Sequence, residues 1–428
     1  MSRKIAALSR RRHRSVFSAA FAALVALVAS PVLAQTPEEP PTRAGLMEKA
    51  RETMATESMP PHRSSIERGL SWYDNQYLFA KLLGGWKGIR LAGSDFPAGA
   101  GLKAGIGYDK ALRSADNDPL IPNRIDLTAR GAYSTRGYAR FGAGLNARNL
   151  GGSRVDVGVS GQYYEFPQED FFGLGMDSLE SNETNFLLDA IETGVSVHWK
   201  PSKFEFGGGL AYFSPRVGRG TDGRSPSTDE LFTTATAPGL GTETDFLKTD
   251  LSAAFDWRDN AAYPHAGGRY AVAVTNFADR DLGRHDFYRV DVNLQQYVPL
   301  PDRYRLIALR ADGVFTNADR DKSVPFYLQP TLGGASHLRG FRESRFRDQN
   351  SVLVGAEYRW EAWWALDPAL FIDAGMVAPS RRSLSLRDME VGYGVGFRLH
   401  SNRAFTARLD LAFSREGFVP LLRFEHVF

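Results

Sequence analysis

The sequence predicts an all-β fold: a sixteen-stranded antiparallel β-barrel that spans a membrane. Three observations predict it. First, apolar and polar residues alternate with a period of two along most of the chain, as they do in strands with two different faces. Second, after the N-terminal segment no apolar run approaches the roughly 20 residues that a spanning helix needs. Third, short and long connections alternate between the predicted strands, and the chain ends on an aromatic residue, Phe428.

Residues 1–34 have the pattern of a secretory signal peptide. Six basic residues come first, an uncharged apolar run follows from Val16 to Ala29, and Val32-Leu33-Ala34 forms a small-residue cleavage site. The apolar run is too short for a spanning helix, which needs roughly 20 residues. We therefore expect a mature chain that begins at Gln35.

The charge of the chain changes sign when this segment is removed. The whole chain carries +3, from 52 basic and 49 acidic residues, and the signal segment holds six of the basic residues and none of the acidic ones. The mature chain therefore carries about −3, which gives no reason to expect a nucleic-acid partner. The absence of cysteine excludes a lipid-anchored lipoprotein and suits passage through an oxidising periplasm.

Residues 35–76 read as a periplasmic linker that is largely unstructured. Five prolines punctuate it, and 43–57 is the one candidate for a short helix. It contains too few apolar residues to offset the entropy of ordering a packed domain. The barrel domain is therefore expected over 77–428.

Sixteen segments of the barrel domain read as strands. They are 77–92, 100–109, 123–134, 136–147, 153–163, 186–199, 203–213, 245–257, 268–277, 285–297, 304–316, 350–361, 368–377, 389–399, 404–414 and 419–428. In the tenth, the charged and amide side chains of Arg289, Asp291 and Asn293 oppose aliphatic neighbours. Two structures have this pattern: a soluble sheet with one wet face, and a membrane barrel that is apolar outside and polar inside. The export signal and the loop lengths favour the barrel.

Loop lengths and tryptophans set the orientation. With both termini in the periplasm, the turns at 200–202, 298–303, 362–367 and 400–403 are short, and the long connections at 164–185, 214–244 and 317–349 are extracellular. Five of the seven tryptophans lie beside the periplasmic turns: Trp199, Trp257, Trp360, Trp363 and Trp364. This placement is typical of an aromatic girdle at one membrane interface.

Several motifs resemble the bacterial surface antigen family of outer-membrane barrels, which includes the insertases BamA and TamA. Pro325-Phe326-Tyr327, Leu332-Gly333-Gly334 and Leu338-Arg339-Gly340-Phe341 are similar to the family's sixth extracellular loop. Asp256, Arg258, Asp259 and Gly267 are similar to the family's turn before the ninth strand. Glu357-Tyr358-Arg359 and Phe371-Ile372-Asp373-Ala374-Gly375 look like its twelfth and thirteenth strands, and Gln168–Gly175 resembles a loop motif of its shorter members. The match is dense from 256 to 428.

The resemblance implies that the sixth extracellular loop folds into the lumen and that Arg339 pairs there with acidic residues. Gly340 and Phe341 belong to the same loop motif. The alternation agrees independently, because aliphatic neighbours of Glu357 and Asp373 face lipid and turn both carboxylates inward. A guanidinium, always charged and planar, suits such a pair. We expect these five residues to lock the loop in the lumen.

The last strand carries Phe424 and Phe428, which resemble the signal by which such barrels are themselves assembled. His426 stands where an aromatic residue is usual. The linker is too short for even one of the periplasmic POTRA modules with which the insertases capture clients. The chain therefore resembles a barrel-only member of the family.

The sequence contains no hydrolase elbow, phosphate-binding glycine loop or zinc-binding His-Glu-x-x-His pair. We expect no enzyme activity, no metal and no cofactor. The expected function is insertion or translocation of proteins or lipids at the outer membrane of a Gram-negative bacterium, through the seam between 77–92 and 419–428. The alternatives are a passive channel, a barrel-embedded phospholipid hydrolase and a structural or adhesive role. Expected partners are outer-membrane lipid and lipopolysaccharide, unfolded client proteins and a periplasmic partner.

Overall fold

The computed structural model describes residues 88–91, 96, 99–113, 124–150, 154–301, 304–363, 366–400 and 405–423. The chain divides into two units, Met1–Trp86 and Lys87–Phe428, and all described residues belong to the second. The predicted signal peptide (1–34), the linker (35–76) and the assembly-signal residues Phe424 and Phe428 lie outside the described residues.

The barrel strands overlap the predicted segments, and of the first predicted strand, 77–92, only residues 88–91 lie among those described. They are β1 (Ile89–Leu91), β2 (Lys103–Arg113), β3 (Arg124–Ser134), β4 (Ala139–Arg148), β5 (Val155–Phe171), β6 (Thr184–Trp199), β7 (Phe204–Arg219), β8 (Phe246–Asp256), β9 (Gly267–Asp279), β10 (Phe287–Pro299), β11 (Arg305–Ala318), β14 (Asn350–Trp360), β15 (Leu366–Ala378), β16 (Glu390–His400), β17 (Phe405–Ser414) and β18 (Gly417–Arg423). Short elements lie in the connections: η2 (Glu180–Asn182), α5 (Thr228–Leu231), η3 (Phe326–Leu328), β12 (Thr331–Leu332), β13 (Phe346–Arg347) and η4 (Arg381–Ser383).

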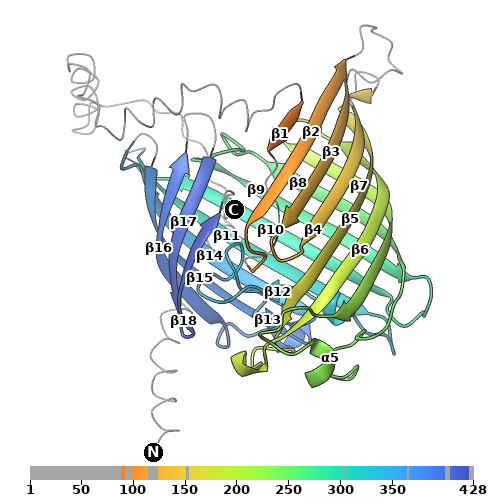
Figure 1. Cartoon of the computed structure of the whole chain (residues 1–428). Coiled ribbons are helices and arrows are strands. Elements are labelled where there is room, and N and C mark those ends of the chain that lie inside the picture. Colours follow the sequence, from red (N-terminus) through yellow and green to blue (C-terminus); the bar gives the residue numbers. More distant parts are fainter. Residues whose placement is uncertain are drawn as a thin grey trace, which may run out of the picture. The chain divides into compact units, whose positions relative to one another are not determined.

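The sixteen barrel strands, β1–β11 and β14–β18, form one antiparallel sheet in which each strand pairs with the next barrel strand in sequence. The sheet curls into a barrel (Figure 1). β1 and β18 are the two end members of the sheet, and no pairing between them is present among the described residues. β12 and β13 form a separate two-stranded sheet within the connection from β11 to β14. We call that connection, residues 319–349, loop 6.

Two strands extend far beyond their predicted ends. β5 continues to Phe171 and β7 to Arg219, so the predicted loops 164–185 and 214–244 shrink to 172–183 and 220–245. The pairing of β5 with β4 ends at Glu165, and the pairing of β7 with β8 ends at Phe213. Past these residues both strands pair only with β6. Proline is tolerated at such an edge, so Pro215 does not end β7. β5 has 17 residues, whereas a strand needs about 9–11 to span a membrane. The extension formed by the ends of β5, β6 and β7 therefore projects beyond the membrane.

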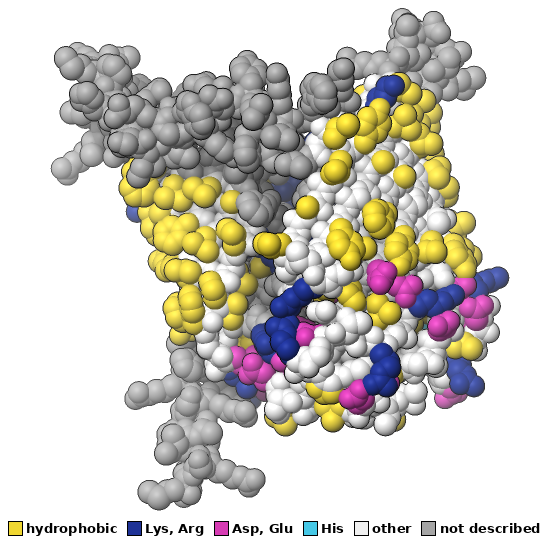
Figure 2. Space-filling model, in the orientation of Figure 1, with side chains coloured by type: hydrophobic (Ala, Val, Ile, Leu, Met, Phe, Trp, Pro, Cys, Tyr) yellow, Lys and Arg dark blue, Asp and Glu magenta, His cyan; other side chains and the backbone are white. Residues whose placement is uncertain are grey.

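The outer face of the sheet is apolar. Alternate side chains such as Val195, Leu251 and Leu422 are 50%, 68% and 62% exposed, and Figure 2 shows hydrophobic side chains along the visible strands. Charged side chains gather towards the end that carries the long loops, at the bottom of the view. No helix among the described residues has the length and apolar character to cross a membrane. Such a surface suits contact with lipid.

Aromatic side chains fill the barrel at its long-loop end. One cluster joins β5, β6, the 220–245 loop and loop 6 through Phe171, Phe186, Ala237, Phe326 and Tyr327, and a second joins β7 to β10 with Val324 of loop 6. We call these two clusters the cap. In the first cluster the Phe326 ring of loop 6 packs against Phe171 of β5 and Phe186 of β6, so the cap attaches loop 6 to these strands.

Candidate functional site

Loop 6 turns back into the barrel and is buried there. Leu338, Arg339 and Phe341 are at most 1% exposed, and Phe341 packs with Leu353 of β14 and Val377 of β15 in one apolar cluster. The paired β12 and β13 hold the two arms of the loop together. The hairpin within the loop thus presents Arg339 to the inner face of β14 and β15.

Arg339 lies between the two carboxylates that the sequence singled out. Its Nε donates to Asp373 Oδ2 at 2.6 Å and one terminal nitrogen donates to Asp373 Oδ1 at 3.0 Å. The other terminal nitrogen donates to Glu357 Oε2 at 2.9 Å. All three side chains are 0% exposed. This is the forked geometry for which a guanidinium is suited and an ammonium is not.

The ring of Phe371 completes the seat of Arg339. The guanidinium carbon lies 3.6 Å from the ring centroid. Phe371 comes two residues before Asp373 on β15, so the ring and the carboxylate point to the same side of the sheet. Stacking on the ring and the fork of hydrogen bonds together hold the guanidinium plane in one orientation.

The site is larger than the sequence predicted. Four more arginines and one aspartate converge on it, each at most 3% exposed: Arg310 of β11, Arg359 of β14, Arg398 of β16, and Arg408 and Asp410 of β17. Arg398 bridges Glu357 at 2.7 Å and Asp410 at 2.5 Å. Arg359 lies 2.6 Å from Glu357. Together with Arg339, Glu357 and Asp373, these five residues make a group of eight charged side chains, which we call the lock.

Two members of the lock also bind the backbone of loop 6. Arg310 donates to the carbonyl oxygens of Ser336, at 2.7 Å, and of His337. Arg408 donates to the carbonyl oxygen of Ala335 at 2.9 Å. The loop is therefore held from β11 on one side and from β17 on the other, with β14, β15 and β16 between them.

Glycines make room for the loop against the barrel wall. A Cβ on Gly392 of β16 would meet the carbonyl oxygen of Arg339 at 1.7 Å, which excludes any other residue without movement of the loop. Gly340 has φ +93°, and its own carbonyl accepts a hydrogen bond from Ser414 at 2.6 Å. The loop and β16 thus approach each other backbone to backbone.

His337 is the titratable group of the loop beside the lock. Burial, and then the neighbouring Arg310 guanidinium, lower the pKa of His337 to about 4. The imidazole is therefore neutral at neutral pH and adds no charge to a site that already holds five arginines.

The predicted motif turn lies elsewhere. Asp256 and Arg258 form a two-pronged ion pair, 2.9 and 2.7 Å, at the short-turn end between β8 and β9, and Asp259 accepts the amide hydrogens of Asn260 and His265. Gly267 has φ +92°, and a Cβ there would meet the carbonyl of Trp257 at 2.3 Å. The four residues shape one tight turn, whereas the lock is built on β11, β14, β15, β16 and β17.

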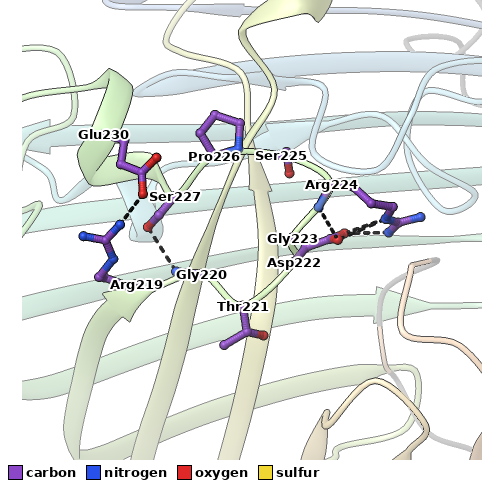
Figure 3. Close-up of a pocket in the computed structure, with 10 residues that line it drawn as sticks. All are labelled: Arg219, Gly220, Thr221, Asp222, Gly223, Arg224, Ser225, Pro226, Ser227 and Glu230. Carbon is purple, nitrogen blue, oxygen red and sulfur yellow. Dashed lines mark hydrogen bonds and ion pairs between the residues drawn. The ribbon is translucent and has the colours of Figure 1, made fainter.

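Two further features of the described residues bear on metal or ligand binding. They contain no group of three or more His, Asp and Glu side chains placed to hold a metal ion. A hollow of about 370 Å³ lies in the 220–245 loop, lined by Arg219–Ser227 and Glu230 (Figure 3). Its charged side chains pair with one another, Arg219 with Glu230 and Arg224 with Asp222.

Sequence reasoning placed the inward carboxylates but missed five members of the site: Arg310, Arg359, Arg398, Arg408 and Asp410. The alternation already assigns Arg408 and Asp410 to the polar face of their strand. What it cannot give is the register between five strands, which brings Arg398 opposite Arg408 and Gly355 opposite Asp373.

Comparisons with known proteins agree with this architecture. The Omp85 superfamily domain matches residues 219–417, a span that contains every residue of the lock. The fold is similar to that of BamA from Haemophilus ducreyi lacking POTRA domains 1–3, with a TM-score of 0.56 and 14% identity over 77% of this chain and 69% of that one. CdiB from Acinetobacter baumannii and CdiB from Escherichia coli match at TM-scores of 0.44 and 0.45, each with 14% identity, over 76% and 78% of this chain. The chain covers 55% and 60% of those two structures.

Proposed function

We propose, from the premise that this chain is a BamA/TamA-like barrel carrying an Omp85 superfamily domain, that it inserts or translocates proteins, or lipids, at the outer membrane of a Gram-negative bacterium. In this proposal the long loops are extracellular and the short turns periplasmic. The surrounding partners are outer-membrane lipid and lipopolysaccharide, and unfolded outer-membrane proteins are the clients, delivered by a periplasmic partner. The proposal includes no enzymatic step and no nucleic acid.

The observation that carries the proposal is the filling of the lumen by loop 6. Eight buried charged side chains from the loop and five strands hold it there. Desolvating so many charges is costly unless they remain paired, so the loop has one strongly preferred position. A barrel that places its most constrained segment across its interior is poorly suited to passing cargo lengthwise.

The sheet ends offer the other route. β1 and β18 are the end members of the sheet, and an unpaired strand edge presents a row of backbone N–H and C=O groups. In lipid such groups must find partners, so an incoming client strand can add to the edge by β-augmentation. The step we propose is opening of the seam between β1 and β18, followed by pairing of a client strand with one edge.

The test times the insertion of an unfolded client barrel into liposomes that contain the refolded protein, into empty liposomes, and into liposomes with Arg339→Ala. Arg289→Ala is the matched control, because the Arg289–Asp291 pair on β10 is 32% and 34% exposed and lies outside the lock. We expect acceleration by the wild-type protein and by Arg289→Ala, and a marked loss with Arg339→Ala. No acceleration by the folded wild-type barrel would contradict the proposal.

A passive channel is the second candidate, and one observation favours it. The wall from β4 to β8 carries a polar network with partly exposed side chains, in which Gln162 donates to Glu192 at 2.9 Å and Lys248 lies 2.5 Å from Glu192. Small residues such as Gly194 and Gly209 lie beside it. A channel predicts steady conductance in planar bilayers that rises when 319–349 is deleted. An insertase whose cap seals the lumen predicts low conductance in the intact protein.

A further inference from the structure

The last described residue of β18 reaches across the seam. Arg423 lies 3.3 Å from the carboxylate of Glu343 in loop 6, and its other terminal nitrogen donates to the carbonyl oxygen of Phe96 at 3.5 Å. Phe96 belongs to the connection between β1 and β2, on the far side of the seam. One side chain therefore contacts both loop 6 and the opposite edge of the sheet.

The Phe96 end of this contact is fixed. The Phe96 ring is 1% exposed and packs against Tyr138 and Phe166, with centroids 5.9 and 6.0 Å away. Its carbonyl also accepts a hydrogen bond from the Lys103 ammonium at 2.9 Å, so two cations share one oxygen. Phe96 is thereby attached to Tyr138, in the turn before β4, and to Phe166 of β5, on the N-terminal side of the seam.

The Glu343 end is fixed as well. Gly334 has φ +79°, and a Cβ there would meet the Glu343 carboxylate at 2.2 Å, so the turn of loop 6 leaves space for this side chain. Glu343 lies four residues after Arg339, which the lock holds in place. The position of Glu343 therefore depends on the lock, and the position of Arg423 depends on Glu343.

We propose that Glu343, Arg423 and the Phe96 carbonyl form a latch that holds the two edges of the seam together, and that releasing the latch lets the edges separate. This inference rests on the proposed function, in which opening of the seam admits a client strand. The latch would regulate that opening. Among the described residues, the latch consists of one ion pair, which joins β18 to loop 6, and one hydrogen bond, which joins β18 to Phe96. Such a contact can break and reform without unzipping a strand, and it connects the buried loop to the moving edge.

The latch pair is accessible enough to respond to its surroundings. The side chains of Arg423 and Glu343 are 16% and 25% exposed, in contrast to the 0% of Arg339 and Asp373. A partly exposed ion pair is weaker than a dry one and is screened by salt. The lock is thus built to stay closed, and the latch is built to open.

The test measures the width of the seam directly, without a client. The chain contains no cysteine, so single cysteines can be introduced cleanly at Leu102 and Leu422, which are 81% and 62% exposed on either side of the seam. Leu422 faces the opposite side of β18 from Arg423, so a label there leaves the latch in place. Spin labels at the two positions report the distance between the edges by pulsed EPR in lipid nanodiscs.

Glu343→Gln keeps the shape of the side chain and removes its charge. We expect its distance distribution to gain a longer component that the parent protein lacks. Glu183→Gln is the matched control, because Glu183 pairs with Arg342, the neighbour of Glu343, but connects loop 6 only to the 172–183 loop. We expect this control to keep the parent distribution. The same distribution in Glu343→Gln as in the parent would overturn the proposal.

A second pair of variants keeps the test decisive if Glu343→Gln does not fold. Arg423→Met removes both the ion pair with Glu343 and the hydrogen bond to the Phe96 carbonyl and should lengthen the distance, whereas Arg423→Lys keeps a cationic donor and should lengthen it less. A parent-like distance in Arg423→Met would also overturn the latch. A widened seam in a barrel that accelerates no client insertion would leave the latch standing and contradict the proposed function, so the two failures are distinguishable.

Discussion

The two sides of the lumen use the same residue types and differ in what covers them. On the side of β11 and β14–β17, Arg339 and Asp373 form an ion pair with both side chains 0% exposed under loop 6. On the opposite side, the Arg124–Asp126 pair on β3 is 46% and 10% exposed. Arginine and carboxylate alone therefore do not make a lock. The covering loop does, because it removes the water that would otherwise weaken and replace each contact.

The largest expected effect is the loss of stability on removing an arginine that loop 6 buries, compared with one outside the lock. Arg339→Ala leaves Glu357 with Arg359 and Arg398, and Asp373 with Arg310, so the remaining arginines limit the damage. We expect a loss of about 3 kcal/mol in the free energy of unfolding, the low end for breaking a buried pair. Arg289→Ala on β10 should cost less than about 1 kcal/mol. Urea unfolding in detergent micelles, followed by tryptophan fluorescence, measures both, and equal losses would show that burial under loop 6 does not matter.

A smaller effect is expected where the wall meets the loop. Gly392→Ala places a methyl group where the Arg339 carbonyl lies, so the loop or β16 must shift. We expect a cost of about 2 kcal/mol, within the range for overpacking a well-packed interior, and faster proteolysis of loop 6. The control is Gly223→Ala in the 220–245 loop, where an added Cβ meets no atom within 4 Å. Similar proteolysis of both variants would contradict a tight seat for the loop.

The sequence was sufficient for the strands because each strand carries its own two-faced pattern. Alternation alone turns Glu357 and Asp373 inward, and the structure places both in the lumen. Periodicity could not predict that Arg339 pairs with these carboxylates, because Arg339 lies in a loop. Only the family resemblance implied that pairing. Arg398 and Asp410 meet because neighbouring strands are staggered in a particular register, and that stagger is a property of the whole sheet.

The ends of the long strands escaped prediction for a different reason. Pro215 and the acidic residues after Phe166 interrupt the alternation, and the predicted strands stop before them, at 213 and 163. Both strands continue because β6 alone pairs with their last residues, outside the lipid, where no apolar face is required. Phe171 lies in the extended part of β5 and meets the Phe326 ring of loop 6 only in the folded barrel.

The division of the lumen into a loop-filled side and an open side is tested most directly by thiol reactivity. The chain contains no cysteine, so Ser160→Cys on β5 and Ala412→Cys on β17 each give one reporter. Both positions face the lumen; Ser160 is exposed, whereas Ala412 is 0% exposed beneath loop 6. We expect a water-soluble maleimide to modify the folded Ser160→Cys barrel rapidly and the folded Ala412→Cys barrel only after unfolding. Equal rates at the two positions in the folded protein would contradict a lumen that loop 6 fills on one side.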